Sequence, residues 1–226
     1  MTDKKEKIKD FFIYSLFQLR IWKKIYAGIT HFMIFWGVLI QVVGTAINLM
    51  QMRLFTPFEL PIPRAGGYLF YEWIMDLAGV FIIVGVLMAL IRRLVMRPKY
   101  MGYKWDDYFA IVLLTLMALA GFTSEGMRLV SVSPDWSGTS FIGSYVADLF
   151  RAWGVTPDIA FSTHPYFVLL HVFLGLVFAA ALPFTKMRHI IMAPLNIWLR
   201  PRHVMGALEK IEDIDEAEIL GVGNIN

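Results

Sequence analysis

Two histidines, one within and one just beyond a long apolar stretch, are the residues best suited to chemistry in this sequence. Residues 166–184 are apolar except for His171, and His189 follows their end beside Lys186 and Arg188. Neutral imidazole is a good ligand for haem iron, and an ionisable group inside a lipid-spanning helix usually has a function. We therefore favour b-type haem ligation, with a histidine that only hydrogen-bonds a neighbouring helix as the alternative.

The stretch that carries these histidines predicts a membrane-spanning helix. At about 1.5 Å per residue, residues 166–184 reach about 28 Å, which is close to the hydrocarbon thickness of a bilayer. Residues 162–165 offer helix caps and a proline suited to the first turn. An unbroken helix would place His171 and His189 on one face, five turns apart, although Pro183 between them can kink it.

The composition is that of an integral membrane protein. Of the 226 residues, 58% are hydrophobic and only 17% are charged, and the mean hydropathy is +0.59. The chain has no cysteine. Disulfides, thiolate metal sites, iron–sulfur clusters and covalent haem attachment through cysteine are therefore excluded within it.

Four apolar segments predict an all-α membrane protein, a bundle of about four transmembrane helices. We expect the spans at residues 25–50, 68–91, 108–130 and 166–184. Residues 11–22 and 141–153 are too short or too polar to span and are typical of interfacial amphipathic helices. The expected organisation is a basic leader (1–24), a transmembrane haem-binding domain (25–202) and an acidic tail (203–226).

The distribution of lysine and arginine predicts the orientation. Segments 1–24, 92–104 and 186–210 hold 17 of the 21 such residues, and a four-helix model places all three segments on one side. Positive residues favour the cytoplasmic side. We therefore expect a multi-pass protein of the cell membrane with both termini in the cytoplasm.

This orientation places His31, at the start of the first span, level with His189, at the end of the fourth. Two imidazoles at equal depth on different helices are what a bis-histidine haem requires. Arg20, Lys186 and Arg188 are expected at the same level, where they could pair with haem propionates.

The outer half of the predicted bundle is less regular. His171 is expected about two turns outward of the midplane, where Gln41, a poor iron ligand, lies at the matching level of the first span. A second haem with an unusual sixth ligand, or a hydrogen bond from His171 to a quinone, are the alternatives. Gln41, Thr45, Thr115 and His171 are the polar residues near the midplane, which is too few for a small transporter or channel.

Polar residues near the outer ends predict a quinol site. Glu125, Arg128 and His164 could bind a quinol and take up its protons, since an acid–base group must lie within hydrogen-bond reach of the hydroxyl. The alternatives are a simple i,i+3 ion pair between Glu125 and Arg128 and a helix-start role for His164. Glu72 and Asp76 are further carboxylates expected at this end.

Three motifs resemble a family of membrane cytochromes b. They are HFMIFWGVLIQVVGT from His31, GFTSEGMR from Gly121, and PFTKMRHIIMAPLNIWLRP around His189. They are similar to the gamma subunit of respiratory nitrate reductase and its relatives, especially the cytochrome b subunits of Dsr- and Hme-type menaquinol oxidoreductases and of membrane heterodisulfide reductase. The tail EAEILGVGNIN resembles the linker that precedes an iron–sulfur domain in fused relatives.

The resemblance implies an electron-transfer function. Family members oxidise menaquinol near the outer face and deliver electrons to a cytoplasmic iron–sulfur subunit, here of the heterodisulfide-reductase type. His31 and His189 match ligands of the inner haem b, and His171 matches a ligand of the outer haem, whose family partner is replaced by Gln41. Lipid, menaquinone and further membrane or periplasmic redox subunits are the other expected partners, and nucleic acid is not. A haem-free membrane anchor is the competing function.

Overall fold

The computed structural model describes residues 2–51, 66–99, 102 and 104–200. The predicted acidic tail, 203–226, lies outside these residues. Every regular element in the described part is helical, with no strand. Five short helical segments connect or flank the α-helices: Phe11–Leu16, Ile21–Lys23, Arg92–Met96, Ser137–Thr139 and Lys186–Arg188. The α-helices are α1 (Thr2–Asp10), α2 (Ile25–Gln51), α3 (Gly66–Ile91), α4 (Trp105–Val132), α5 (Phe141–Ala152), α6 (Pro157–Ala181) and α7 (His189–Leu199).

Four of these helices are long and apolar enough to cross a membrane, which confirms the predicted fold class. They are α2, α3, α4 and α6, and each exceeds the roughly 20 residues that a bilayer requires. Helix α5 has 12 residues and reaches only about 18 Å, so it is too short to span. It occupies the position predicted for an interfacial amphipathic helix.

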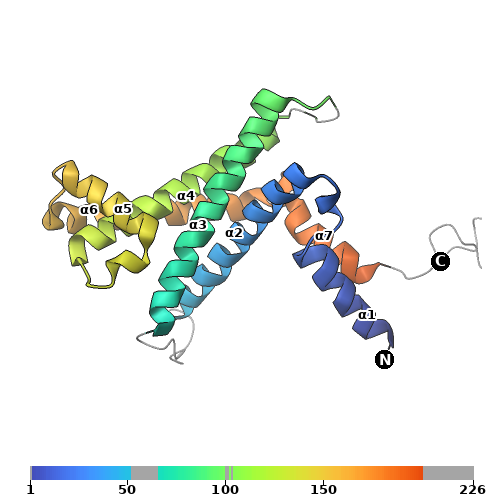
Figure 1. The fold of residues 1–226 in the computed structure, drawn as a ribbon, viewed down its shortest axis with the longest axis horizontal. Helices are drawn as coiled ribbons and strands as arrows, with labels where there is room; N and C mark the ends of the chain where they lie inside the picture. Colours follow the sequence, from blue (N-terminus) through green and yellow to red (C-terminus); the bar gives the residue numbers. More distant parts are fainter. Residues whose placement is uncertain (1, 52–65, 100–101, 103, 201–226) are drawn as a thin grey trace, which may run out of the picture.

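The spans pack as two pairs. Helix α2 packs mainly against α3, α6 packs mainly against α4, and contacts between α3 and α4 join the pairs, which cross obliquely in Figure 1. The shared core contains Val86 from α3, Leu113 from α4 and Phe178 from α6. In α6, only 6% of the most apolar window is buried. Much of the apolar surface of α6 is therefore free to face lipid or a bound apolar group.

The fourth span differs from its prediction at both ends. Helix α6 begins at Pro157, because the Thr156 hydroxyl accepts a hydrogen bond from the Ile159 amide at 3.4 Å and proline suits the first helical position. Pro165 therefore lies inside the helix and not in its first turn. The helix ends at Ala181, and Pro183 lies in the turn that follows, where its missing N–H is not needed for a helical hydrogen bond.

These boundaries change the expected placement of two histidines. His171 and His189 belong to separate helices, α6 and α7, so the single unbroken face predicted for them is not formed. His171 lies close to the middle of α6, and its depth relative to the membrane midplane stays a prediction. The earlier helix start, nine residues before Tyr166, accounts for this central position within the helix.

The predicted interfacial helix at residues 11–22 is divided into two short helical segments. Phe11–Leu16 and Ile21–Lys23 are separated by Gln18, whose backbone adopts a left-handed conformation with φ 54°. The leader folds back onto α7, with the rings of Phe11 and Trp198 6.2 Å apart. Figure 1 shows α1 and α7 side by side, so the two ends of the described helical region meet at one end of the protein.

Close helix packing gives the first testable expectation. A Cβ built on Gly37 of α2 would lie 2.8 Å from the Ala78 carbonyl oxygen of α3. Backbone cannot yield as a side chain can, so Gly37→Ala is expected to destabilise the protein by about 1–3 kcal/mol. Gly66→Ala at the start of α3 meets nothing within 4 Å and serves as the control. Thermal unfolding of the detergent-solubilised chain measures both, and equal midpoints for the two variants would contradict the packing.

Candidate functional site

His31 and His189 face each other although 158 positions separate them in the chain. The centroids of their rings lie 6.1 Å apart, with 48° between the ring planes. His31 lies near the start of α2, and His189 is the first residue of α7. The structure therefore brings together the two imidazoles that the sequence places at one level.

Three histidines share one hydrogen-bonding arrangement. Nδ1 of His31 lies 2.8 Å from Oε1 of Gln18, and Nδ1 of His189 lies 2.6 Å from the carbonyl oxygen of Lys186. Nδ1 of His171 lies 3.0 Å from the carbonyl oxygen of Met117. Because these oxygens only accept, each Nδ1 carries a proton and donates it, which leaves the lone pair of each Nε2 free. This is how metal-ligating histidines are held.

The His31–His189 pair fits a metal whose other ligands are not protein side chains. A centroid separation of 6.1 Å is compatible with one metal ion held by both rings, since metal–nitrogen bonds are about 2 Å long. Among the described residues, no group of three or more His, Cys, Asp or Glu could hold a metal ion. Two facing nitrogen donors without further protein ligands suit the iron of a porphyrin, which supplies its own four nitrogens.

The cations predicted beside this pair have different surroundings. The Arg20 guanidinium lies 4.6 Å above the ring of Tyr14, and Arg188 is exposed. The Lys186 ammonium donates to Asp107 at 2.8 Å, and this hydrogen bond raises the pKa of Lys186. Lys186 thereby connects the segment before α7 to the first turn of α4, and propionate binding by these cations stays a prediction.

His171 lies against a glycine of α4. A Cβ built on Gly121 would approach Cε1 of His171 to 3.2 Å, so the absence of a side chain lets the ring reach the Met117 carbonyl. Gln41, expected at the matching level, donates from Nε2 to the Met75 carbonyl of α3 at 2.9 Å. The Gln41 amide is therefore engaged within the α2–α3 pair.

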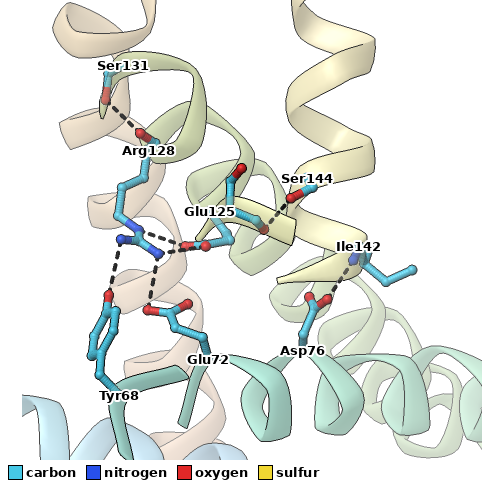
Figure 2. Close-up of polar contacts among 9 residues, drawn as sticks. Tyr68, Glu72, Asp76, Glu125, Arg128, Ser131, Ile142 and Ser144 are labelled. Carbon is cyan, nitrogen blue, oxygen red and sulfur yellow. Dashed lines mark hydrogen bonds and ion pairs between the residues drawn. The ribbon is translucent and has the colours of Figure 1, made fainter. Parts of the chain in front are cut away.

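A second polar cluster lies far from the histidine pair, at the other ends of α3 and α4. Figure 2 shows Arg128 between two carboxylates and a phenol. The guanidinium binds Glu125 in a bidentate manner at 2.7 and 2.9 Å, lies 3.1 Å from Glu72, and donates to the Tyr68 hydroxyl at 3.2 Å. It also stacks 5.3 Å from the centroid of the Trp136 ring. The cluster therefore holds two carboxylates around one cation.

Helix α5 closes this cluster. Asp76 accepts a hydrogen bond from the Ile142 amide at 2.5 Å, so a carboxylate of α3 caps the first turn of α5, where the helix dipole favours negative charge (Figure 2). A Cβ on Gly143 would lie 2.6 Å from Cγ of Glu125, so the glycine gives Glu125 its space. His164, on α6, lies within electrostatic range of Arg128 and Glu125.

The sequence analysis missed several residues of these sites. Tyr68 and Trp136 complete the surroundings of Arg128, and Gln18, Met117 and Gly121 hold two of the histidines. The motif GFTSEGMR contains both Gly121 and Arg128, so it could have indicated that the contact with His171 and the Arg128 cluster share α4. The expected i,i+3 pair of Glu125 and Arg128 exists, and Glu72 extends it.

The arrangement supports two chemical roles at opposite ends of the spans. The histidine pair offers two nitrogen donors to a metal, and the Arg128 cluster offers carboxylates and a phenol that can exchange protons. Carboxylates held by one guanidinium can bind a hydroxyl group and accept its proton.

Comparison of the sequence with known proteins identifies a family that most of the chain matches. The family model of the nitrate reductase gamma subunit matches residues 18–207 of the chain. EtfAB:quinone oxidoreductase of Syntrophomonas wolfei is 27% identical over 97% of this chain and 31% of its own length. One subunit of the dihydromethanophenazine:CoB–CoM heterodisulfide reductase of Methanosarcina barkeri is 30% identical over 80% of this chain and 62% of its own length.

The nitrate reductase-like protein NarX of Mycobacterium tuberculosis is 25% identical over 79% of this chain and 27% of its own length. The chain thus spans about a third of the first of these relatives and less than two thirds of the others. No solved structure matches the chain.

The shared cation of the second cluster gives a prediction about stability. Arg128→Met leaves Glu72 and Glu125 without their guanidinium, so we expect a loss of about 1–3 kcal/mol. Adding Glu125→Gln to this variant removes one uncompensated charge and should restore part of the stability. A double-mutant cycle by thermal unfolding measures the coupling. Strictly additive effects would contradict the ion-pair account.

Proposed function

This chain belongs to the nitrate reductase gamma subunit family, and on that premise we propose that it is a b-haem membrane subunit of a respiratory oxidoreductase. It passes electrons from menaquinol, oxidised near the outer face, to a cytoplasmic iron–sulfur subunit. The protein lies in the cell membrane with both termini in the cytoplasm. The names of its relatives include a quinone oxidoreductase and a heterodisulfide reductase subunit, which supports a redox function within a complex.

One observation carries this proposal: His31 and His189 face each other, and each Nδ1 donates to an oxygen. An oxygen acceptor on Nδ1 of both rings is the arrangement found for metal-ligating histidines. Haem b, when bound by these residues, supplies one-electron redox chemistry. His171, held in the same manner by the Met117 carbonyl, is the protein ligand available to a second haem or a hydrogen-bond partner for a quinone.

Uncovered apolar helix surface in the described part of the chain supports the binding of an apolar macrocycle. Helix α2 packs mainly against α3, and α6 packs mainly against α4, and only 6% of the most apolar window of α6 is buried. Arg20, Lys186 and Arg188 lie close in sequence to these elements and are the proposed partners of propionates. The backbone carbonyl of Lys186 orients the ring of His189. Asp107 in turn binds the side-chain ammonium of Lys186.

The Arg128 cluster is the proposed quinol site. Oxidation of a menaquinol to the quinone releases two protons and two electrons. Glu125 accepts a hydroxyl proton, Arg128 holds the Glu125 carboxylate in place, and His164 and Glu72 provide neighbouring groups that exchange protons with it. The protons leave at the outer end, and the electrons are passed toward the cytoplasmic partner.

The haem assignment is tested by removing one ring at a time. His31→Ala and His189→Ala should each lower the haem content of the purified chain by one haem, since each removes an axial ligand. Pyridine haemochrome spectra measure the content, and His164→Ala, at the other end of the spans, is the control that keeps it. Full haem content in His31→Ala would contradict the proposal and favour a haem-free membrane anchor.

The quinol site is tested separately. Glu125→Gln keeps the size and polarity of the side chain but removes the base, so menaquinol oxidation by the assembled complex should fall by about 100-fold or more. The haem content should not change, because Glu125 lies far from His31 and His189. A rate equal to that of the unmodified complex would exclude Glu125 as the proton acceptor.

A further inference from the structure

We propose that Gln18 is a positioning residue for His31, which sets the orientation and basicity of this ring and thereby the reduction potential of the inner haem. This inference rests on the proposed haem ligation by His31 and His189. Gln18 lies in the leader, which precedes the first membrane-spanning helix α2. The carboxamide oxygen of Gln18 lies 2.8 Å from Nδ1 of His31, 13 positions further along the chain.

Gln18 is unusually buried for a polar residue in an interfacial segment. It is only 5% exposed, whereas its neighbours Phe17 and Leu19 are more than half exposed. Burial of an amide is costly unless the amide is hydrogen-bonded. The bond to His31 satisfies the carboxamide oxygen and gives a reason for the inward orientation.

The backbone of Gln18 supports a specific use of this side chain. Its φ of 54° lies in the left-handed region, which glycine and asparagine adopt more readily than glutamine. Gln18 directly follows Phe17, the C-cap of the Phe11–Leu16 segment, a position where left-handed residues are common and where glycine or asparagine is usual. Asparagine would adopt this left-handed backbone more readily than glutamine. The backbone conformation therefore does not explain why the longer glutamine side chain stands at position 18.

The surrounding contacts fix Gln18 in its place. Its carbonyl accepts from the Ile21 amide at 2.9 Å, and the indole of Trp22 donates to the Phe17 carbonyl at 3.1 Å. Phe11, earlier in the leader, packs against Trp198 of α7, the helix that begins with His189. The same leader therefore contacts both helices that carry the histidine pair.

An acceptor on Nδ1 controls a histidine ligand in two ways. It prevents rotation of the ring, and it increases the electron donation of Nε2 to the metal. Stronger donation stabilises the oxidised metal and lowers its reduction potential. His189 receives the same kind of support from a backbone carbonyl, which substitution cannot remove. Substitution of Gln18 can therefore change the Nδ1 hydrogen bond of His31, and with it the reduction potential of the haem.

Two substitutions of opposite effect test the proposal. Gln18→Asn keeps an amide and suits the left-handed backbone, but its side chain is one carbon too short to reach His31. The reduction potential of the inner haem should therefore rise, and the haem affinity of the apoprotein should fall by about 10–100-fold. Gln18→Glu presents a carboxylate to Nδ1, so the potential should fall below that of the unmodified protein.

The control is Tyr26→Phe, which removes a hydrogen bond of 2.9 Å between α2 and the Met88 carbonyl near the same end of α2. It should leave the potential unchanged. Optical redox titration of the full chain, purified with its haem, measures all four proteins. The His31→Ala variant identifies which transition belongs to the inner haem.

The outcomes separate this inference from the proposed function. Shifts of opposite sign in Gln18→Asn and Gln18→Glu support it, because loss of structure alone would move both variants in one direction. An inner haem that needs His31 but keeps its potential in both variants overturns the role of Gln18 and leaves the function intact. Full haem content in His31→Ala overturns both.

Discussion

Hydrogen bonds from polar side chains within the spans to carbonyls of neighbouring helices constrain how these helices pack. An apolar environment offers a polar group no solvent, so each group must find a partner within the protein or bind a ligand. Gln41 and Tyr26 of α2 meet carbonyls of α3, and His171 meets a carbonyl of α4. In each histidine, an oxygen acceptor on Nδ1 leaves the lone pair of Nε2 for a ligand. The need to pair polar groups in lipid thus connects the fold to the proposed haem ligation.

The two polar sites differ in how they meet this constraint. The Arg128 cluster compensates its charges within itself and against the first turn of α5, which confines the cluster to one end of the spans. In the histidine pair, each Nδ1 is hydrogen-bonded to an oxygen acceptor, which leaves Nε2 as the nitrogen that a ligand would use. Helix α4 connects the two sites, since it carries Glu125 and Arg128 at one end, Gly121 and Met117 near its middle, and Asp107 at the other end.

Much of the fold and part of the site could be predicted from the sequence. Apolar length identified the four spans, and the asymmetry of lysine and arginine placed His31 and His189 at one level. The predicted start of α6 was wrong because the signal of Thr156 and Pro157 precedes the apolar run, and the earlier start places His171 near the middle of the helix. The contacts of Gln18, Tyr68 and Trp136 depend on how helices rotate against each other, and one sequence does not specify these rotations.

The central claim is that His31 and His189 hold one haem iron between them. Electron paramagnetic resonance of the oxidised full chain, combined with near-infrared magnetic circular dichroism, tests it most directly. We expect a low-spin ferric haem with two imidazole ligands. A purely high-spin signal, or axial ligands other than two imidazoles for every haem in the chain, would contradict the account.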